Sequence, residues 1–224
     1  MAVKRRMAPE NAATRVLLMD AVESLMREQG YAAVSARAVA ALTGLKYPTI
    51  FYYFETMDDL LLTTYRRRTQ SVLERTDAAL NSDRPLHALW SAASDPFDAA
   101  LSLEYMALSN HNELVRAETI AFGERMRRIV ADRLSDRLRR APGDDTGIFT
   151  PFGITLSLTS LGGLLGFESA LGISGGHEEI EVIVDWVLRR LEGEDSSAVL
   201  KRPRASVKKP RRALRRRSPG KRPT

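Results

Sequence analysis

The sequence predicts an all-α protein of about nine helices, with a small N-terminal helix-turn-helix domain followed by a larger helical bundle. Apolar residues recur at intervals of three and four along most of the chain, and no segment shows the alternation typical of a strand. The run from Ser35 to Phe54 has the pattern of two short helices joined by a tight turn. With 224 residues, 44% of them hydrophobic, the chain is long enough to bury a sizeable core.

The first predicted helix spans residues 11–29. Leu17, Ala21 and Leu25 repeat at i, i+4 and i+8, with Leu18 and Val22 beside them, so they form an apolar stripe along one side of the helix. Gly30 follows as the residue that ends the helix, because glycine readily adopts the left-handed backbone conformation.

The second and third predicted helices are short and closely spaced. The second spans residues 36–42, is capped by the hydroxyl of Ser35, and is followed by a turn at Gly44. The third starts at Pro48 with Tyr47 as its cap, because a proline disfavours the helical conformation in the residue before it. The residues expected to face the core are Val39, Ala40, Ile50 and Phe54.

Six further helices are predicted, the first of them opened by Asp58 and Asp59. They span residues 58–80, 85–93, 97–110, 112–140, 150–171 and 178–191, with a loop at 141–145. The stretch 146–167 is uncharged and long enough to raise the question of a membrane span. Because proline, glycine and hydroxyl residues interrupt it, we interpret it as a buried helix of a soluble protein, and we expect no membrane partner.

The net charge of +6 conceals two parts of opposite charge. Residues 196–224 contain 12 of the 34 basic residues and no acidic one, which leaves 22 basic and 28 acidic residues, a net charge of −6, in residues 1–195. The tail shows no packing pattern, so we expect it to be disordered. Such a tail binds polyanions without sequence preference; the alternative is a tail that only solubilises the protein. A positive surface on the folded part must be local.

The run from Ser35 to Phe54 carries side chains suited to contact a DNA duplex. A helix-turn-helix places its second helix in the major groove, where Thr49 can reach a base edge and Lys46 a phosphate. Tyrosine hydroxyls suit phosphate oxygens, and Arg37 can meet the flanking backbone. The alternative, that the tyrosines are core residues, is disfavoured because so many aromatics cannot all be buried on so short a helix. The predicted DNA contacts are Ser35, Arg37, Lys46, Tyr47, Thr49, Tyr52 and Tyr53.

The segment from Thr14 to Tyr65 resembles the N-terminal domain of the tetracycline-repressor (TetR) family. The matching residues are Gly30-Tyr31, Ser35, Val39-Ala40, Gly44-Leu45, Thr49-Ile50-Phe51, Phe54 and Asp58-Asp59-Leu60. Lys46 and Pro48 stand where the family usually has serine and glycine. Phe51 and Met57 replace a tyrosine and a lysine that usually contact the DNA backbone, and Lys46 is a candidate to compensate for one of these contacts.

The resemblance implies a homodimer whose interface is formed by the last two helices. Here those are residues 150–171 and 178–191, where neighbouring glycines leave a groove for close helix approach. The alternative is that these glycines pack only within the subunit. The candidate interface residues are Gly162, Gly166, Ile180, Ile183 and Val187.

The resemblance also implies a pocket for a small-molecule effector among the middle helices. Aromatic and methionine side chains there would suit a mostly apolar ligand held by a few polar groups. The alternative for each of these residues is an ordinary place in the core. The candidate lining residues are Trp90, Phe97, Tyr105, Met106, His111, Phe122, Met126 and Phe152.

Together these features predict a homodimeric DNA-binding transcriptional regulator, a repressor released from a pseudo-palindromic operator by a small, largely apolar effector. The alternative is an effector-independent architectural or nucleoid-type protein that binds double-stranded DNA through its basic tail. The predicted organisation is a flexible N-terminus (1–10), a helix-turn-helix DNA-binding domain (11–57), an effector-binding and dimerisation domain (58–194) and the disordered tail (195–224).

An enzyme is not expected, and neither a cofactor nor a metal site is predicted. The chain has no cysteine nucleophile, no glycine-rich phosphate loop, no Gly-x-Ser-x-Gly and no histidine pair at metal spacing. The absence of cysteine also excludes disulfides and indicates the reducing cytoplasm, with association to the nucleoid when DNA is bound.

Overall fold

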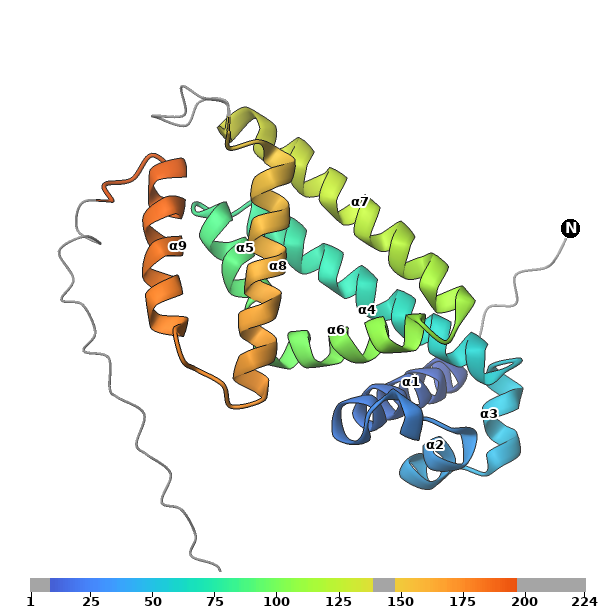
Figure 1. Ribbon diagram of the computed structural model, residues 1–224. Helices are drawn as coiled ribbons and strands as arrows, with labels where there is room; N and C mark the ends of the chain where they lie inside the picture. Colours follow the sequence, from blue (N-terminus) through green and yellow to red (C-terminus); the bar gives the residue numbers. More distant parts are fainter. Residues whose placement is uncertain (1–8, 139–147, 197–224) are drawn as a thin grey trace, which may run out of the picture.

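The computed structural model describes residues 9–138 and 148–196, and within these ranges it contains nine α-helices, one short 3-10 helix and no strand. The all-α prediction is therefore confirmed. Helices α1 to α3 form one group, and α4 runs from this group into the C-terminal helices (Figure 1). The elements are α1 (Pro9–Gln29), η1 (Tyr31–Ala33), α2 (Ala36–Thr43), α3 (Tyr47–Tyr53), α4 (Met57–Leu80), α5 (Pro85–Ala93), α6 (Pro96–Ser109), α7 (Glu113–Leu138), α8 (Pro151–Ala170) and α9 (His177–Leu191).

The turn between α2 and α3 is formed by a capped helix and a glycine, as predicted. The Ser35 hydroxyl oxygen accepts a hydrogen bond from the backbone N–H of Ala38 at 3.2 Å, which satisfies one of the unpaired donors at the start of α2. Gly44 ends this helix with a φ of 70°, a conformation that residues with a Cβ rarely adopt. The angle between α2 and α3 is therefore set by residues 35–44.

The start of α3 differs from the prediction by one residue. Lys46 is the N-cap and Tyr47 is already helical, whereas we expected Tyr47 to be the cap. The reason is that the N–H of Thr49 bonds to the carbonyl of Lys46 at 2.8 Å, so the first turn includes Tyr47. Pro48 fits in this turn because the N–H groups there need no helical partner.

Helix α4 likewise begins one residue earlier than predicted, at Met57. The hydroxyl of Thr56 accepts a hydrogen bond from the N–H of Asp59 at 3.0 Å and caps the helix. The predicted helix 112–140 corresponds to α7, whose described part ends at Leu138. Helix α1 begins at Pro9, so residues 9 and 10 of the predicted flexible N-terminus (1–10) are helical. The rest of that segment, the loop 141–145 and nearly all of the basic tail lie outside the described residues.

The first of two hydrophobic cores joins the helix-turn-helix group to α4, α6 and the start of α7. Its buried residues include all four that the sequence predicted on α2 and α3, and Ile50 is fully buried. On α1 the predicted residues Leu18, Ala21, Val22 and Leu25 are buried, whereas Leu17 is 44% exposed, contrary to the prediction. Leu101 and Tyr105 of α6 enter the same core.

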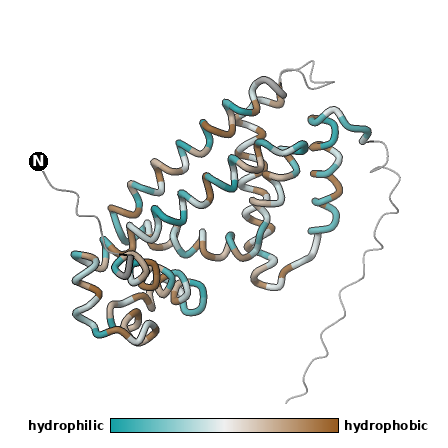
Figure 2. Tube along the Cα trace, turned by 180° about the vertical axis from the view of Figure 1, so that it is seen from behind, coloured by the Kyte–Doolittle hydropathy of each residue, from teal (hydrophilic) through white to brown (hydrophobic). Residues whose placement is uncertain are grey.

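The second core lies among the C-terminal helices, where Leu134 of α7 and Leu188 of α9 are fully buried. Helix α8 packs against α5, α6 and α7, and α9 lies at the outer side of α5 (Figure 1). Hydrophilic and hydrophobic positions alternate along the long helices, as expected of helices with one buried face (Figure 2). None of the helices described is both long and apolar enough to cross a membrane.

Candidate nucleic-acid interface and ligand cavity

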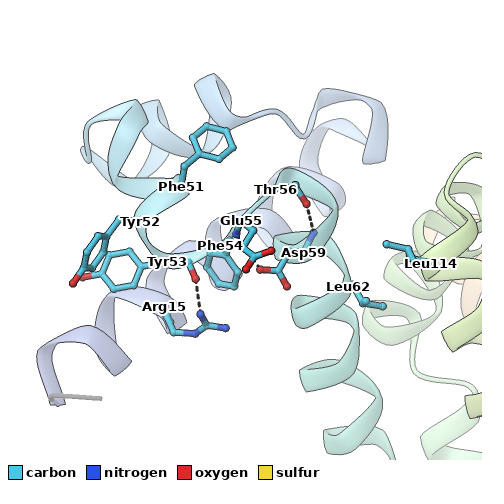
Figure 3. A pocket seen from close by; sticks show the side chains of 10 residues that line it. All are labelled: Arg15, Phe51, Tyr52, Tyr53, Phe54, Glu55, Thr56, Asp59, Leu62 and Leu114. Carbon is cyan, nitrogen blue, oxygen red and sulfur yellow. Dashed lines mark hydrogen bonds between the residues drawn. The ribbon is translucent and has the colours of Figure 1, made fainter. Parts of the chain in front are cut away.

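The outer surface of α3 is unusually rich in exposed aromatic side chains. Tyr52 is 74% exposed, Tyr47 49% and Phe51 38%, although Ile50 of the same short helix is fully buried. Phe51 and Tyr52 project from α3 (Figure 3). Both line a hollow of about 690 Å³. Exposed aromatic groups clustered in this way are typical of a surface that a partner covers.

Polar residues flank these rings on α2 and at the start of α3. Ser35, Arg37 and Lys46 are exposed, and Thr49 is half-buried. Arg37 and Lys46 are the two basic residues between positions 36 and 53. The surface therefore combines hydroxyl groups and rings with only two positive charges of its own.

Tyr53 differs from the other predicted contacts because it is engaged inside the domain. Its hydroxyl lies 3.2 Å from the Asn11 side-chain oxygen, and its backbone carbonyl accepts a hydrogen bond from Arg15 at 2.6 Å (Figure 3). The Arg15 guanidinium also lies 4.2 Å from the centre of the Phe54 ring. Arg15 thus fixes the end of α3 from α1, a contact across 38 residues that no local pattern signals.

A contact between α6 and the helix-turn-helix group was also missed by sequence reasoning. The carboxylate of Glu104 accepts a hydrogen bond from the backbone N–H of Tyr31 at 2.7 Å, at the link between α1 and α2. The Tyr31 ring stacks on His111, with 5.8 Å between ring centres. Because Glu104 and His111 hold this link, α6 and the turn after it position α2.

A cavity of about 570 Å³ lies among α4, α5, α6, α7 and α8. Most of its wall is apolar, and it includes three of the predicted lining residues, Met106, Phe122 and Met126. Such a volume is within the usual range of small-molecule sites, about 300–1,000 Å³. Further apolar lining is supplied by Val72, Leu89, Leu103, Leu158, Leu164 and Phe167.

The structure places the other five predicted lining residues outside this cavity. Phe97 and Tyr105 lie on the side of α6 that meets α1. The Arg27 guanidinium lies 3.7 Å from the centre of the Phe97 ring, and Tyr105 is buried in the first core. Met106 and Ser102 occupy the opposite side of α6 and line the cavity. Trp90 packs against the second core, Phe152 is exposed, and His111 stacks on Tyr31.

Part of the cavity wall is an ion-pair cluster in which Arg68 and Asp98 are largely buried and Arg75 is half exposed. Arg68, which is only 8% exposed, donates hydrogen bonds to the Asp98 carboxylate at 3.1 Å, to the Asp98 backbone carbonyl and to the Ser102 hydroxyl. Arg75 donates to the other carboxylate oxygen of Asp98. Burial alone would raise the pKa of Asp98, but the hydrogen bond from Arg75 and the charges of both arginines outweigh it and hold this pKa below its ordinary value.

The predicted interface glycines of α8 pack inside the subunit, which was the alternative reading. A Cβ on Gly162 would lie 2.8 Å from the Cβ of Ala93, and one on Gly166 would lie 2.9 Å from that of Ala99. Their lack of a side chain lets α8 approach α5 and α6 closely. On α9, Ile183 is exposed, whereas Ile180 and Val187 are half-buried.

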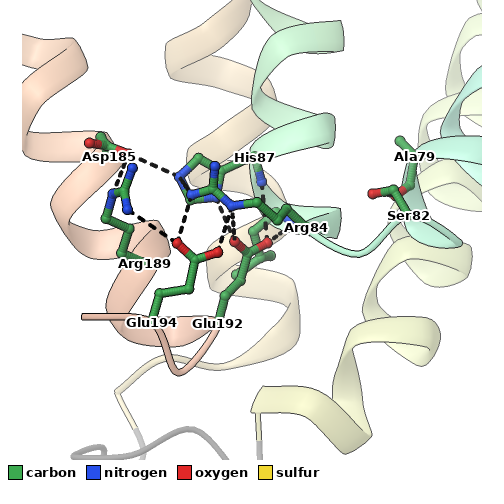
Figure 4. A network of polar contacts seen from close by, with 9 residues as sticks. Ala79, Ser82, Arg84, His87, Asp185, Arg189, Glu192 and Glu194 are labelled. Atoms are coloured by element: carbon green, nitrogen blue, oxygen red, sulfur yellow. Dashed lines mark hydrogen bonds and ion pairs between the residues drawn. The ribbon is translucent and has the colours of Figure 1, made fainter. Parts of the chain in front are cut away.

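A network of charged side chains holds the end of α9 against the start of α5 (Figure 4). His87 lies between two carboxylates, with its Nδ1 2.5 Å from Glu192 and its Nε2 3.1 Å from Asp185. Arg84 pairs with Glu194 at 2.6 Å. Burial would raise the pKa of Asp185, but hydrogen bonds and charge from His87 and Arg189 prevail and lower it.

Comparison with known proteins agrees with this architecture. Residues 18–64 match the family model of bacterial regulatory proteins, tetR family. Nothing among curated proteins matches the chain. No group of three or more potential metal-ligating side chains is found among the residues described.

Several solved structures share the fold at low sequence identity. One is described as a transcriptional regulator from Saccharomonospora viridis in complex with choline (TM-score 0.64, 20% identity, 81% of this chain and 95% of that chain covered). Another is described as a transcriptional regulator from Pseudomonas aeruginosa PAO1 (TM-score 0.64, 19% identity, 88% of this chain and 98% of that chain covered). A third is GusR of Salmonella enterica (TM-score 0.63, 17% identity, 85% of this chain and 100% of that chain covered). The chain therefore shares its fold with these proteins over nearly their full length.

Proposed function

We propose that this chain, whose N-terminal helix-turn-helix domain is of the tetR family of bacterial regulatory proteins, is a homodimeric DNA-binding regulator of transcription. We propose further that it is a repressor, which a small and largely apolar effector releases from a pseudo-palindromic operator. The observation that carries DNA binding is the exposure of Tyr47, Phe51 and Tyr52 on a helix that buries Ile50 completely.

In this proposal α3 lies in the major groove and its side chains divide into two roles. Thr49, Tyr47 and Tyr52 approach the base edges and the sugar-phosphate backbone. Lys46 and Arg37 contact phosphates, and the N-terminus of α2, with its Ser35 cap, faces the flanking strand. With so few positive charges on α2 and α3, affinity depends strongly on each of them.

Dimerisation is supported by apolar side chains that remain exposed on the last two helices. Val182 and Ile183 of α9 are exposed in the single chain, as are Leu156 and Leu164 of α8, which also line the cavity. A symmetric pairing of these faces would bury them and would present two copies of α3 to two half-sites of a palindrome. The predicted contact at Gly162 and Gly166 is replaced in this proposal by the exposed leucines, because the glycines face α5 and α6.

Release by an effector is supported by helices that reach both the cavity and the DNA-binding group. Helix α6 lines the cavity through Met106 and holds Tyr31 through Glu104. Helix α4 lines the cavity through Arg68, and its Arg67 pairs with Asp20 of α1 at 2.7 Å. A ligand can release DNA only if it binds more tightly to a state in which these contacts differ. The choline complex of one structural relative supports a small-molecule ligand in this fold.

The proposal is tested by selecting bound duplexes from a random pool with the full chain. We expect an enriched inverted repeat with half-site centres about 34 Å apart, or a multiple of that distance. We also expect Tyr52→Ala to weaken binding to the selected site, with Tyr52→Phe as the control that keeps the ring. A pool without any enriched sequence, or a monomer at micromolar concentration in light scattering, would contradict the proposal.

The second candidate is an architectural DNA-binding protein without an effector, and the basic tail favours it. Residues 196–224 carry 12 positive charges and no negative one, which suits salt-sensitive binding to any duplex. The same selection separates the candidates, since an architectural protein would bind the pool tightly without enriching a motif.

A further inference from the structure

The charged residues that line the cavity are unequal in sign. They are three arginines, Arg68, Arg75 and Arg127, and one carboxylate, that of Asp98. Since Asp98 neutralises only one of the three positive charges, the cavity wall carries a positive excess.

The single carboxylate is not available to a ligand. Both of its oxygens accept hydrogen bonds from arginines, one from Arg68 at 3.1 Å and the other from Arg75. A cationic ligand would therefore have to displace a guanidinium from a buried pair, which costs the desolvation of a charge left without its partner.

The hydroxyl groups of the cavity are largely committed to the helices that carry them. Thr155 donates its hydrogen to the carbonyl of Pro151 at 2.7 Å, and Ser102 donates to the carbonyl of Asp98 at 2.8 Å. Thr159 donates to the carbonyl of Thr155 at 2.9 Å. These hydroxyls can accept hydrogen bonds, but their hydrogens already have partners. Thr76 and Ser160 add two further lining hydroxyls, and the charged donors that the cavity offers a ligand are the guanidinium N–H groups.

Arg127 is the arginine with the weakest protein partner. Within the part of the chain that the structure describes, its ion pair is with Glu124 on the same helix, at 3.8 Å, which exceeds hydrogen-bonding distance. Both side chains are about half exposed, so this pair contributes little. Arg127 lies between the lining residues Met126 and Val130, at the edge of the apolar wall.

We propose that the cavity binds an amphipathic anion, in which an apolar body lies against Met106 and Phe122 and a carboxylate-type head pairs with Arg127. A carboxylate only accepts hydrogen bonds and a guanidinium only donates them, so the two are complementary and can form two parallel bonds. The apolar wall favours a carbon chain or ring system through burial from water. This ligand class rests on the proposed effector role for its regulatory meaning.

The experiment is calorimetric titration of the full chain, without DNA, with three compounds of equal chain length: decanoate, decan-1-ol and decyltrimethylammonium. We expect decanoate to bind at least about tenfold more tightly than the alcohol, since a charged hydrogen bond contributes more than that factor. We expect the ammonium compound to bind most weakly. Equal or tighter binding of the alcohol or of the ammonium compound would overturn the proposal.

Two matched variants locate the head group on α7. Arg127→Gln is expected to weaken decanoate binding about tenfold and to leave the alcohol unchanged. Arg128→Gln removes the same charge from an exposed neighbour that does not line the cavity, and is expected to change neither. Equal losses in the two variants would overturn the assignment of Arg127. Unfolding curves of both variants verify that the fold is intact.

Failure of this ligand class and failure of the proposed function give different results. The titrations contain no DNA, so their outcome does not depend on whether the chain regulates transcription. Decanoate that binds through Arg127 but does not lower affinity for the selected operator would support the ligand class and contradict effector release.

Discussion

Lys46 occupies the N-cap of α3, a position where serine, threonine, aspartate or asparagine is preferred. Its side chain makes no capping hydrogen bond and is exposed. Serine or threonine there would stabilise the helix by about 1 kcal/mol through a capping bond. A lysine at this position lacks that bond and places a positive charge at the start of α3, next to Tyr47, where a phosphate would lie if α3 enters the groove.

Replacing Lys46 with alanine is expected to weaken binding to every duplex by a similar factor. The lost contact is electrostatic, so the slope of log affinity against log salt should fall by about one unit while the ranking of sequences stays the same. Fluorescence anisotropy over a salt series, with the selected operator and a random duplex, measures both quantities. Arg128→Ala, at an exposed position on α7, is the control, and an unchanged slope for Lys46→Ala would remove Lys46 from the phosphate contacts.

Residue patterns predicted what local spacing controls and missed what tertiary contacts control. The burial of Ile50 and Phe54 and the Ser35 cap follow from helical periodicity and from the preference of hydroxyl residues for helix starts. The contacts of Arg15 with Tyr53 and of Glu104 with Tyr31 join residues 38 and 73 positions apart, so no spacing indicates them. The cavity was predicted only in part for the same reason.

At the scale of elements, α8 owes its position to two glycines on one side. Gly162 and Gly166 are four residues apart and both face the turn between α5 and α6. Gly163 lies on another side of α8, where a Cβ would meet nothing within 4 Å. The sequence showed a small-residue stripe on this helix but could not show which neighbour it fits, since close approach within a subunit and between subunits requires the same residues.

Gly162→Ala and Gly163→Ala form a matched pair that tests this packing. The first places a methyl group 2.8 Å from the Cβ of Ala93 and 3.2 Å from its backbone carbonyl carbon, so we expect destabilisation of about 1–3 kcal/mol. The second meets no neighbour and removes a flexible residue from a helix, so we expect stabilisation of about 0.5–1 kcal/mol. Urea unfolding measures both. Equal effects of the two substitutions would show that α8 does not approach α5 as described.

The attachment of α9 to α5 depends on charged groups that titrate in acid. Asp185 and Asp98 both have pKa values below the ordinary 3.8 in the folded chain. A carboxyl whose pKa is lowered by folding stabilises the fold above its ordinary pKa, and this stabilisation is lost as the pH falls through 3.8 toward the folded-state value. Asp185 therefore stabilises the attachment of α9 at neutral pH, and this contribution is lost in acid.

Acid unfolding tests this attachment. We expect the free energy of unfolding to fall steeply below the ordinary pKa of 3.8. We expect Asp185→Asn to be less stable than the parent at neutral pH but to lose less stability on acidification, because its share of the proton linkage is gone. Urea unfolding over a pH series measures the difference, and Asp132→Asn, at an exposed position on α7, is the control. If the free energy of unfolding falls equally with pH in Asp185→Asn and in the parent, the protonation of Asp185 does not contribute to acid unfolding.

At the scale of the whole molecule, the charge is divided between an acidic body and a basic tail. Residues 1–195 carry a net charge of −6 and residues 196–224 carry +12. An acidic body is repelled by DNA at long range, whereas the tail is attracted to it. The stretch 36–53, which contains α2 and α3, has only two basic residues, Arg37 and Lys46. The tail therefore carries most of the positive charge available for capturing a duplex, while the side chains of α3 would supply the sequence preference.

A stop codon after Asp195 separates these contributions without disturbing the end of α9. The truncated chain keeps Glu192 and Glu194, which pair with His87 and Arg84. We expect the loss of 12 positive charges to weaken binding to random duplexes by a large factor and to reduce the salt slope by several units, because each phosphate contact releases condensed counterions. The ratio of operator to random affinity is expected to rise, since base contacts on α3 remain while the sequence-independent attraction is lost. Anisotropy titrations of both chains over the same salt series measure these quantities, with unfolding curves as the control for folding. An unchanged slope would show that the tail does not contact DNA, and a fall in the affinity ratio would show that it takes part in sequence recognition.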